Sequence, residues 1–316
     1  MNRSPSAAAP RPGRFCPLDY SYRPADFARP PELHAEVLYV AGGLYGNLPA
    51  LDAIEGLAAA EDAPVTILFN GDFHWFDAEP DWFEAVAARV ARHDATRGNV
   101  ETELSRDKDL GAGCGCAYPE TVTEATVRHS NAILTTLRDA APPETASRLA
   151  RLPMHLVVGV GGLRVGVVHG DAHSLAGWEF AHDRLAGPGG GDRLKALQLA
   201  SSIDVFACSH TCLPVLHDRP GPGRLTVINN GAAGMPNFRG TRFGVITRIA
   251  GYPSPHPSLY GVDRDGVRVD ALAVHYDTDA FLRRFTSRWP AGSPAHLSYY
   301  RRIMDGPEHD LADAVV

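Results

Sequence analysis

Short apolar runs recur along the chain, and many of them end at a polar loop that contains glycine. Runs of this length, rich in β-branched residues and bounded by turn residues, are typical of buried β-strands. The glycine pair Gly161-Gly162 between two such runs predicts a hairpin. The predicted strands cover residues 35–41, 65–69, 155–160, 164–168, 203–207, 225–228, 244–249 and 267–274.

Other segments have apolar residues at spacings of three and four, which predicts amphipathic helices. Residues 48–60 show this spacing through Leu51, Ile54 and Leu57, and similar helices are predicted at residues 82–91, 122–137, 144–152, 193–201 and 279–288. Strand–loop–helix units followed by hairpin-like strands indicate a layered α/β fold. We expect an extended Pro- and Arg-rich arm at residues 1–31, one domain at 32–290 and a loose polar tail at 291–316.

The composition narrows the classes of function. Hydrophobic residues make up 44% of the 316 residues and charged residues 21%, so a packed core is expected. A net charge of −7 without a long basic run disfavours nucleic-acid binding, whereas a small phosphorylated substrate stays possible through a bound cation. No apolar stretch is long enough to span a membrane, and residues 1–14 lack the apolar core of a signal peptide. We therefore expect a cytoplasmic protein whose five cysteines are free thiols, and nothing indicates its oligomeric state.

Four polar residues stand just after predicted strands or short loops. Asp72, His169 and His210 follow the runs at 65–69, 164–168 and 203–207, and Asn99 follows Arg97-Gly98. A carboxylate, an amide oxygen and two imidazoles suit Mn²⁺, Fe or Zn²⁺. A single histidine after a strand is usually structural, and a single Asn-Gly-Asp is usually a turn. The prediction of a divalent-metal site therefore depends on the number and order of these residues.

Five short motifs carry a family resemblance. They are Gly-Gly-Leu-Tyr-Gly-Asn (42–47), Asn-Gly-Asp (70–72), Arg-Gly-Asn-Val-Glu (97–101), Val-His-Gly-Asp (168–171) and Ser-His-Thr-Cys (209–212). Together they resemble the calcineurin-like metallophosphoesterases, whose motifs are Asp-x-His-Gly-Asn, Gly-Asp, Gly-Asn-His-Asp/Glu, His and Gly-His-x-His. The segment at 227–236 also resembles the family, and the likeness covers about residues 35–285. It implies a four-layer α/β/β/α sandwich of two mixed sheets flanked by helices, and phosphoester hydrolysis by metal-activated water.

The departures from the family pattern fall on one of its two metal sites. The resemblance implies that Asp72 would bridge two metals, and that Asn99, His169 and His210 would complete one site. The other site would need ligands at the positions of Gly43, Tyr45 and Cys212, which are not the family's residues. We therefore expect about one divalent ion per chain. The family's leaving-group histidine is replaced by Val100, and the retained Glu101 is predicted to be structural.

Four residues could compensate for these losses. His74 could act in catalysis near Asp72 or could only pack; Tyr45 could donate a hydrogen bond to phosphate or could fill the vacated volume. Cys212 could contact the metal or substrate as a thiolate or could be a small hydrophobe, and Asn47 is expected to contact the substrate. Cys114 and Cys116 form a weak zinc motif and are expected to lie in a loop, near the pocket or away from it.

Two functions remain open. The first is a divergent metal-dependent phosphoesterase that hydrolyses a phosphomonoester, a phosphodiester or a nucleotide. The second is a pseudoenzyme that keeps metal or phosphate binding as a sensor or scaffold. The retained ligands Asp72, Asn99, His169 and His210 favour metal binding in both cases, and we favour the enzyme. The sequence lacks the glycine pattern of dinucleotide-binding folds and the Gly-x-Ser-x-Gly motif of serine hydrolases.

Overall fold

The structure is a computed structural model that describes residues 11–316, and in that range it contains two mixed sheets of six strands each. The strands are β1 (Leu33–Ala35), β2 (Val37–Val40), β3 (Val65–Asn70), β4 (Asp94–Thr96), β5 (His155–Val160), β6 (Leu163–Val168), β7 (Val205–Cys208), β8 (Val215–His217), β9 (Thr226–Asn229), β10 (Gly244–Ala250), β11 (Ser258–Arg264) and β12 (Val267–Val274). One sheet has the order β1-β5-β6-β7-β9-β8, and the other has the order β11-β12-β10-β2-β3-β4.

The two sheets pack face to face, because their strands alternate apolar side chains between two faces. In β2, Leu38 and Val40 point into the core between the sheets, together with Val165 and Val167 of β6. The neighbouring residues of β2, Val37 and Tyr39, face the helices instead. Both faces of these strands are therefore buried, which explains why the strands read as continuous apolar runs in the sequence.

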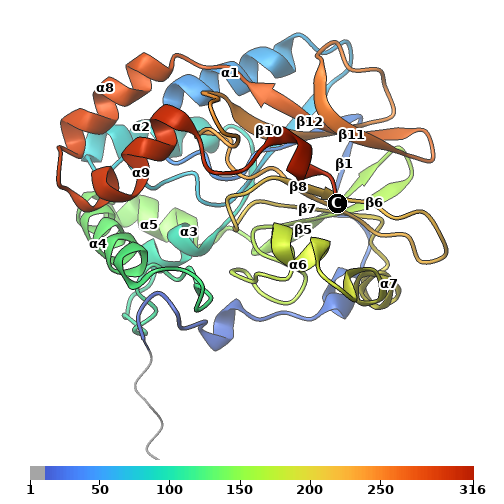
Figure 1. Cartoon of the computed structure of the whole chain (residues 1–316), viewed down its shortest axis with the longest axis horizontal. Coiled ribbons are helices and arrows are strands. Elements are labelled where there is room, and N and C mark those ends of the chain that lie inside the picture. The colour runs from blue at the N-terminus through green and yellow to red at the C-terminus, as the bar shows by residue number, and fades with distance from the viewer. Residues whose placement is uncertain (1–10) are drawn as a thin grey trace, which may run out of the picture.

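Helices cover the outer face of each sheet and complete a four-layer α/β/β/α sandwich (Figure 1). In Figure 1, α1 and α8 lie outside the sheet that contains β10 and β12, and α6 and α7 lie outside the other sheet. The predicted fold class is therefore confirmed. The helices are α1 (Leu48–Ala59), α2 (Pro80–Val90), α3 (Asn99–Leu104), α4 (Glu124–Ala140), α5 (Pro143–Ala150), α6 (His182–Ala186), α7 (Gly190–Ser201), α8 (Thr278–Arg288) and α9 (Pro294–Asp305).

The two ends of the described chain differ from the sequence prediction. Where a loose polar tail is predicted, residues Pro294–Asp305 form α9, which packs against α4 and buries Ile303. Ser293 caps this helix by accepting the His296 N–H, and Pro294 occupies its first turn, so the sequence contained a usable start signal. Of the predicted extended arm, residues 1–10 lie outside the described residues, and the remainder includes two short 3-10 helices, Leu18–Tyr20 and Pro24–Phe27.

The parallel strands bring several loops to one edge of the sandwich. β2, β3 and β4 are parallel neighbours in one sheet, and β6, β7 and β9 are parallel neighbours in the other. Loops that follow parallel strands emerge at the same edge, which is where ligand sites of such folds form. Among the described residues, no helix is both long and apolar enough to cross a membrane.

Candidate metal centre

Four side chains from separate loops meet beyond these strand ends. Asp72 follows β3, His169 follows β6, His210 follows β7, and Asn99 begins α3 just after β4. All four are almost completely buried, with at most 6% of any one exposed. The potential ligand atoms of Asp72, His169 and His210 all lie within 4.8 Å of one another. The structure thus brings together the four residues that the sequence predicts as metal ligands.

Hydrogen bonds to the backbone fix which nitrogen of each histidine carries the proton. His169 Nδ1 lies 2.9 Å from the carbonyl oxygen of Asn70, and His210 Nε2 lies 3.0 Å from the carbonyl oxygen of Cys116. Because a carbonyl only accepts, these nitrogens donate their hydrogens to it. In the neutral rings, His169 Nε2 and His210 Nδ1 are therefore bare acceptors, and they lie 3.0 Å apart.

The two oxygen ligands face the same point. Asn99 Nδ2 donates to the carbonyl oxygen of Cys114 at 2.9 Å, which turns Asn99 Oδ1 toward His169 Nε2 at 3.0 Å. Asp72 Oδ1 lies 3.4 Å from the same nitrogen. With both rings neutral, four acceptor atoms therefore converge in a buried place, and the Val100 N–H donates to one of them, Asp72 Oδ1, at 3.2 Å. Such a cluster is unfavourable unless it holds a positive charge, and its mixture of imidazole, carboxylate and amide ligands fits a divalent cation such as Mn²⁺, Fe²⁺ or Zn²⁺.

The electrostatics of the cluster agree with this demand for positive charge. Burial raises the pKa of Asp72, but the charge and hydrogen bond of His169 outweigh burial and hold that pKa below its usual value. Burial lowers the pKa of His169, yet Asp72 outweighs it and the pKa is raised. Burial and then the neighbouring His169 lower the pKa of His210 to about 3. At neutral pH, Asp72 is therefore ionised and His210 is neutral, whereas the raised pKa of His169 favours a proton that the ring would give up to a metal ion.

Tyr45 occupies the space beside Gly43. A Cβ atom added at Gly43 would lie 2.9 Å from Tyr45 Cε2 and 3.1 Å from Tyr45 Oη. The hydroxyl of Tyr45 also lies 2.8 Å from the sulfur of Cys212. The phenol ring thus fills the volume next to Gly43, which is one of the two roles predicted for it. Tyr45 and Cys212 both also line a cavity that reaches Asp72, Asn99 and His210.

His74 and Asn47 lie away from that cavity. The ring of His74 is fully buried and stacks on Phe83 at a centroid distance of 3.7 Å, and its Nδ1 lies 2.5 Å from Asp77 Oδ2. Asn47 caps α1, where its Oδ1 accepts the Ala50 N–H at 3.0 Å, and its side chain is also fully buried. Both side chains are held by structural contacts, and neither residue lines the cavity.

Glu101 has the structural role that the sequence predicts. Its carboxylate accepts four backbone N–H groups, from Asp72 and Gly98 at 2.8 Å and from Phe73 and His74 at 3.1 and 3.3 Å. The loop that carries Asp72 is therefore tied to the start of α3, where Asn99 lies. Asp72 itself has a φ of 52°, an uncommon conformation that such a network can enforce.

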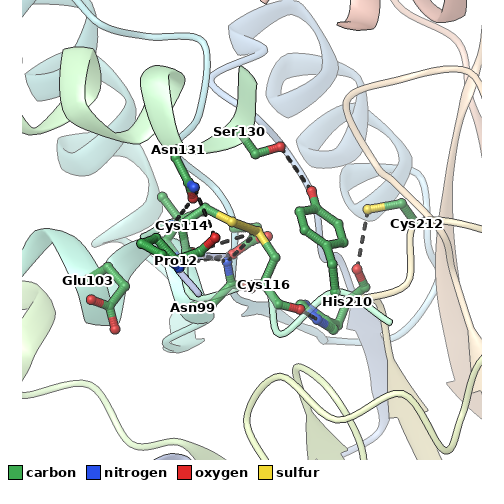
Figure 2. Close-up of a disulfide and its surroundings, with 12 residues drawn as sticks. Pro12, Asn99, Glu103, Cys114, Cys116, Ser130, Asn131, His210 and Cys212 are labelled. Carbon is green, nitrogen blue, oxygen red and sulfur yellow. Dashed lines mark hydrogen bonds between the residues drawn. A yellow bond between two sulfur atoms is a disulfide. The ribbon is translucent and has the colours of Figure 1, made fainter. Parts of the chain in front are cut away.

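Cys114 and Cys116 form a disulfide near Asn99 and His210 (Figure 2), so the prediction of free thiols is wrong for this pair. Cys16, Cys208 and Cys212 are free. A sparse set of cysteines indicates free thiols, but Cys114 and Cys116 are close enough in the chain to close a bond across the single residue Gly115. Cys116 also lines the cavity.

A cavity of about 250 Å³ reaches Asp72, Asn99 and His210 from one side. Its wall is rich in aromatic residues and includes one arginine, Arg302 of α9. Sequence reasoning missed this wall, because its residues come from loops and from α9 and no spacing connects them. The aromatic residues that line the cavity are Tyr45, Trp75, Tyr118, Trp178 and Tyr299.

Comparison with solved structures places the chain in a known fold. A metallophosphoesterase from Sphaerobacter thermophilus is similar over 86% of this chain and 100% of its own length, with a TM-score of 0.56 and 16% identity. A hypothetical protein from Pyrococcus horikoshii OT3 is similar over 86% of this chain and 99% of its own, with a TM-score of 0.59 and 18% identity. No family model matches the chain, and no curated protein matches it. The chain therefore has the metallophosphoesterase fold, in agreement with the resemblance seen in the motifs.

Proposed function

We propose that this chain is a metal-dependent phosphoesterase that uses one divalent ion, held by Asp72, Asn99, His169 and His210. The convergence of four buried acceptor atoms from these residues is the observation that carries the proposal. An ion bound there would supply Lewis acidity to a phosphoryl oxygen and would lower the pKa of a water molecule. Mn²⁺, Fe²⁺ and Zn²⁺ all suit the ligand set.

The residues around the cavity would position the phosphate. Arg302 Nε is a buried donor without an acceptor among residues 11–316, and Arg302 lines the cavity. An anionic phosphate oxygen would satisfy such a donor. Burial, followed by the nearby Cys212, raises the pKa of Tyr45 well above its usual value, so its hydroxyl keeps its proton and can donate to the substrate. His74 has no part in this proposal.

The aromatic wall favours a substrate with a planar ring. Tyr118 and Trp178 lie 6.0 Å apart between ring centroids, and Trp178 meets the ring of His210 edge-on at 5.4 Å. Apolar walls of this kind bind aromatic groups by stacking and by excluding water. We therefore propose that the substrate is a phosphomonoester, a phosphodiester or a nucleotide that contains an aromatic ring.

A pseudoenzyme is the second candidate, and two observations favour it. The ring of Tyr45 fills the place beside Gly43 where the family resemblance predicts a carboxylate. Val100 stands where the same resemblance predicts the acid that assists the leaving group, a role worth roughly 10²–10⁴ in rate. A chain of this kind would bind metal or phosphate without turnover, as a sensor or scaffold.

One experiment separates these functions. The full chain is purified without chelator or added metal, its metal content is measured by elemental analysis, and hydrolysis of aryl phosphomonoesters, aryl phosphodiesters and nucleotides is assayed with Mn²⁺ or Zn²⁺. Asp72→Asn and His210→Gln should each lose the metal and the hydrolysis, whereas His173→Gln, at an exposed histidine, should keep both. Hydrolysis that persists in both Asp72→Asn and His210→Gln would contradict the proposed metal-dependent activity. Metal binding without turnover would favour the pseudoenzyme, and absence of metal binding would exclude the enzyme and leave a pseudoenzyme that binds phosphate.

A further inference from the structure

The segment Cys114-Gly115-Cys116 orients residues of the metal centre through its backbone carbonyl groups (Figure 2). The carbonyl oxygen of Cys114 accepts a hydrogen bond from Asn99 Nδ2 at 2.9 Å. The carbonyl oxygen of Cys116 accepts from His210 Nε2 at 3.0 Å and from Trp178 Nε1 at 3.1 Å. Two residues of the segment, Cys114 and Cys116, thus contact two of the proposed ligands and one residue of the aromatic wall.

These contacts determine which atoms the two ligands present. Without the carbonyl group of Cys114, the Asn99 amide can rotate and turn its NH₂ group toward His169. Without the carbonyl group of Cys116, His210 can place its proton on Nδ1, the atom that faces the centre. Groups that orient metal ligands in this way typically change metal affinity by roughly 10–100-fold when they are lost.

A backbone hydrogen bond from the Gly115 N–H to the carbonyl oxygen of Ala112 at 3.1 Å also holds the segment. Gly113 and Gly115 have positive φ values of 62° and 70°, so the chain around the cysteines is intrinsically permissive. The Cys114 N–H donates to Asn131 Oδ1 at 2.9 Å, which anchors one side of the segment. The disulfide closes the segment covalently, and its reduction would restore conformational freedom to the residues whose carbonyl groups hold Asn99 and His210.

We propose that the Cys114–Cys116 disulfide is a redox site that controls the affinity of the metal centre, with a dithiol as the reductant; this inference rests on the metal site of the proposed function. Cys116 lines the cavity and is 7% exposed, whereas Cys114 is fully buried, so a thiolate would attack the sulfur of Cys116. That thiolate forms a mixed disulfide with Cys116 and expels the Cys114 thiolate, which takes up a proton. The second thiol of the reductant then displaces the Cys116 thiolate, so the reductant leaves as a disulfide and the protein holds two thiols.

The test compares metal affinity in the two redox states of the full chain. Thiols are counted in denatured protein purified in air, before and after treatment with dithiothreitol. The reductant is removed under anaerobic conditions, and binding of Mn²⁺ and Zn²⁺ is then titrated, together with the visible spectrum of bound Co²⁺. Cys114→Ser/Cys116→Ser mimics the reduced state, and Cys16→Ser, at an exposed free cysteine, is the matched control.

Reduction should weaken metal binding by roughly 10–100-fold and change the Co²⁺ spectrum. The double serine variant should bind metal as weakly as the reduced chain, and dithiothreitol should not change its affinity, whereas Cys16→Ser should respond like the unaltered chain.

Metal affinities within about twofold in the two redox states would overturn the inference while leaving the metal site intact. Five thiols per chain, persisting after treatment with diamide, would also overturn it. If neither state binds metal, the metal site and the redox inference fail together. Should the double variant not fold, the two states of the unaltered chain still decide the question.

Discussion

The hydroxyl of Tyr45 lies 2.8 Å from the sulfur of Cys212, although the two residues are 167 positions apart in the chain. Both stand at positions where the family resemblance predicts histidine ligands of a second metal. Gly43, the third altered position, leaves the space in which the ring of Tyr45 lies. The three residues therefore form one packed unit, in keeping with our proposal of a single metal ion held by Asp72, Asn99, His169 and His210.

Substituting the family's residues at Gly43, Tyr45 and Cys212 should show that these three positions are packed as one unit. Gly43→Asp alone should destabilise the chain by about 1–3 kcal/mol, because its Cβ would lie 2.9 Å from the ring of Tyr45. The triple variant Gly43→Asp/Tyr45→His/Cys212→His removes the ring, and we expect its bound metal to rise from about one ion per chain to about two. Thermal unfolding and elemental analysis measure the two effects.

The control for crowding is Gly56→Asp, because an added Cβ at Gly56 in α1 meets no atom within 4 Å. This variant should show a much smaller loss of stability than Gly43→Asp and unchanged metal content. A triple variant that folds and still binds only one ion would show that the altered residues do not occupy a second metal site.

Glu101→Gln should destabilise the loop that presents Asp72. The carboxylate of Glu101 accepts four backbone N–H groups, and a glutamine would turn its NH₂ group toward two of them. We expect a loss of roughly 3 kcal/mol in the free energy of unfolding, with weaker metal binding, because hydrogen bonds to a charged group are strong and buried unpaired donors are costly. Denaturant unfolding measures the loss, and Glu144→Gln, at an exposed glutamate of α5, should change stability by less than about 0.5 kcal/mol. Equal effects of the two substitutions would contradict this role.

The site residues that directly follow β-strands could be predicted from the sequence. Asp72, His169 and His210 each follow an apolar run, and parallel strands place such residues at one edge, so their convergence could be expected without coordinates. The long strands β10 and β12 were also predictable, because their apolar pattern extends over seven and eight residues.

Features set by tertiary contact were not predictable in this way. The three-residue strands β1, β4 and β8 are too short for a hydrophobic period to be visible. His74 follows Asp72 closely in sequence, yet its ring packs on Phe83 instead of entering the cavity. Arg302 reaches the cavity only because α9 packs against α4, a contact between segments that are far apart in the chain.

The stability of the chain should fall as the pH drops from about 6.5 to about 4, in part through His155. Burial and then the charge of Arg29 lower the pKa of His155 from 6.5 to about 4. In this range the unfolded chain binds a proton that the folded chain does not, so stability is fully present above pH 6.5 and decreases with acidity. The contribution is on the order of 2 kcal/mol after allowance for partial exposure of the ring.

Unfolding in urea at pH 7 and pH 5 measures this contribution. His155→Gln should reduce the difference between the two pH values, whereas His34→Gln, at an exposed histidine of β1, should leave that difference unchanged. Since burial also lowers the pKa of His210, from 6.5 to about 3, and that group contributes over the same pH range, the comparison is made between variants and not from the unaltered chain alone. Identical pH dependence in His155→Gln and the unaltered chain would contradict the assignment.

Arg302 should contribute to substrate binding more than to turnover. Its Nη2 donates to the carbonyl oxygen of Cys212 at 2.6 Å, which fixes the guanidinium at the cavity, and its Nε has no acceptor among the described residues. Loss of a charge-assisted hydrogen bond to phosphate typically costs about 1.5–3 kcal/mol. Arg302→Ala should therefore raise KM for an aryl phosphoester by roughly 10–100-fold, with a smaller change in kcat. Arg302→Lys keeps the charge but not the paired donors, so its KM should lie between those of the unaltered chain and Arg302→Ala.

Steady-state kinetics measure these effects. The control is Arg301→Ala, at the adjacent exposed arginine. If Arg301→Ala raised KM as much as Arg302→Ala, the effect would come from general surface charge instead of from a donor in the cavity.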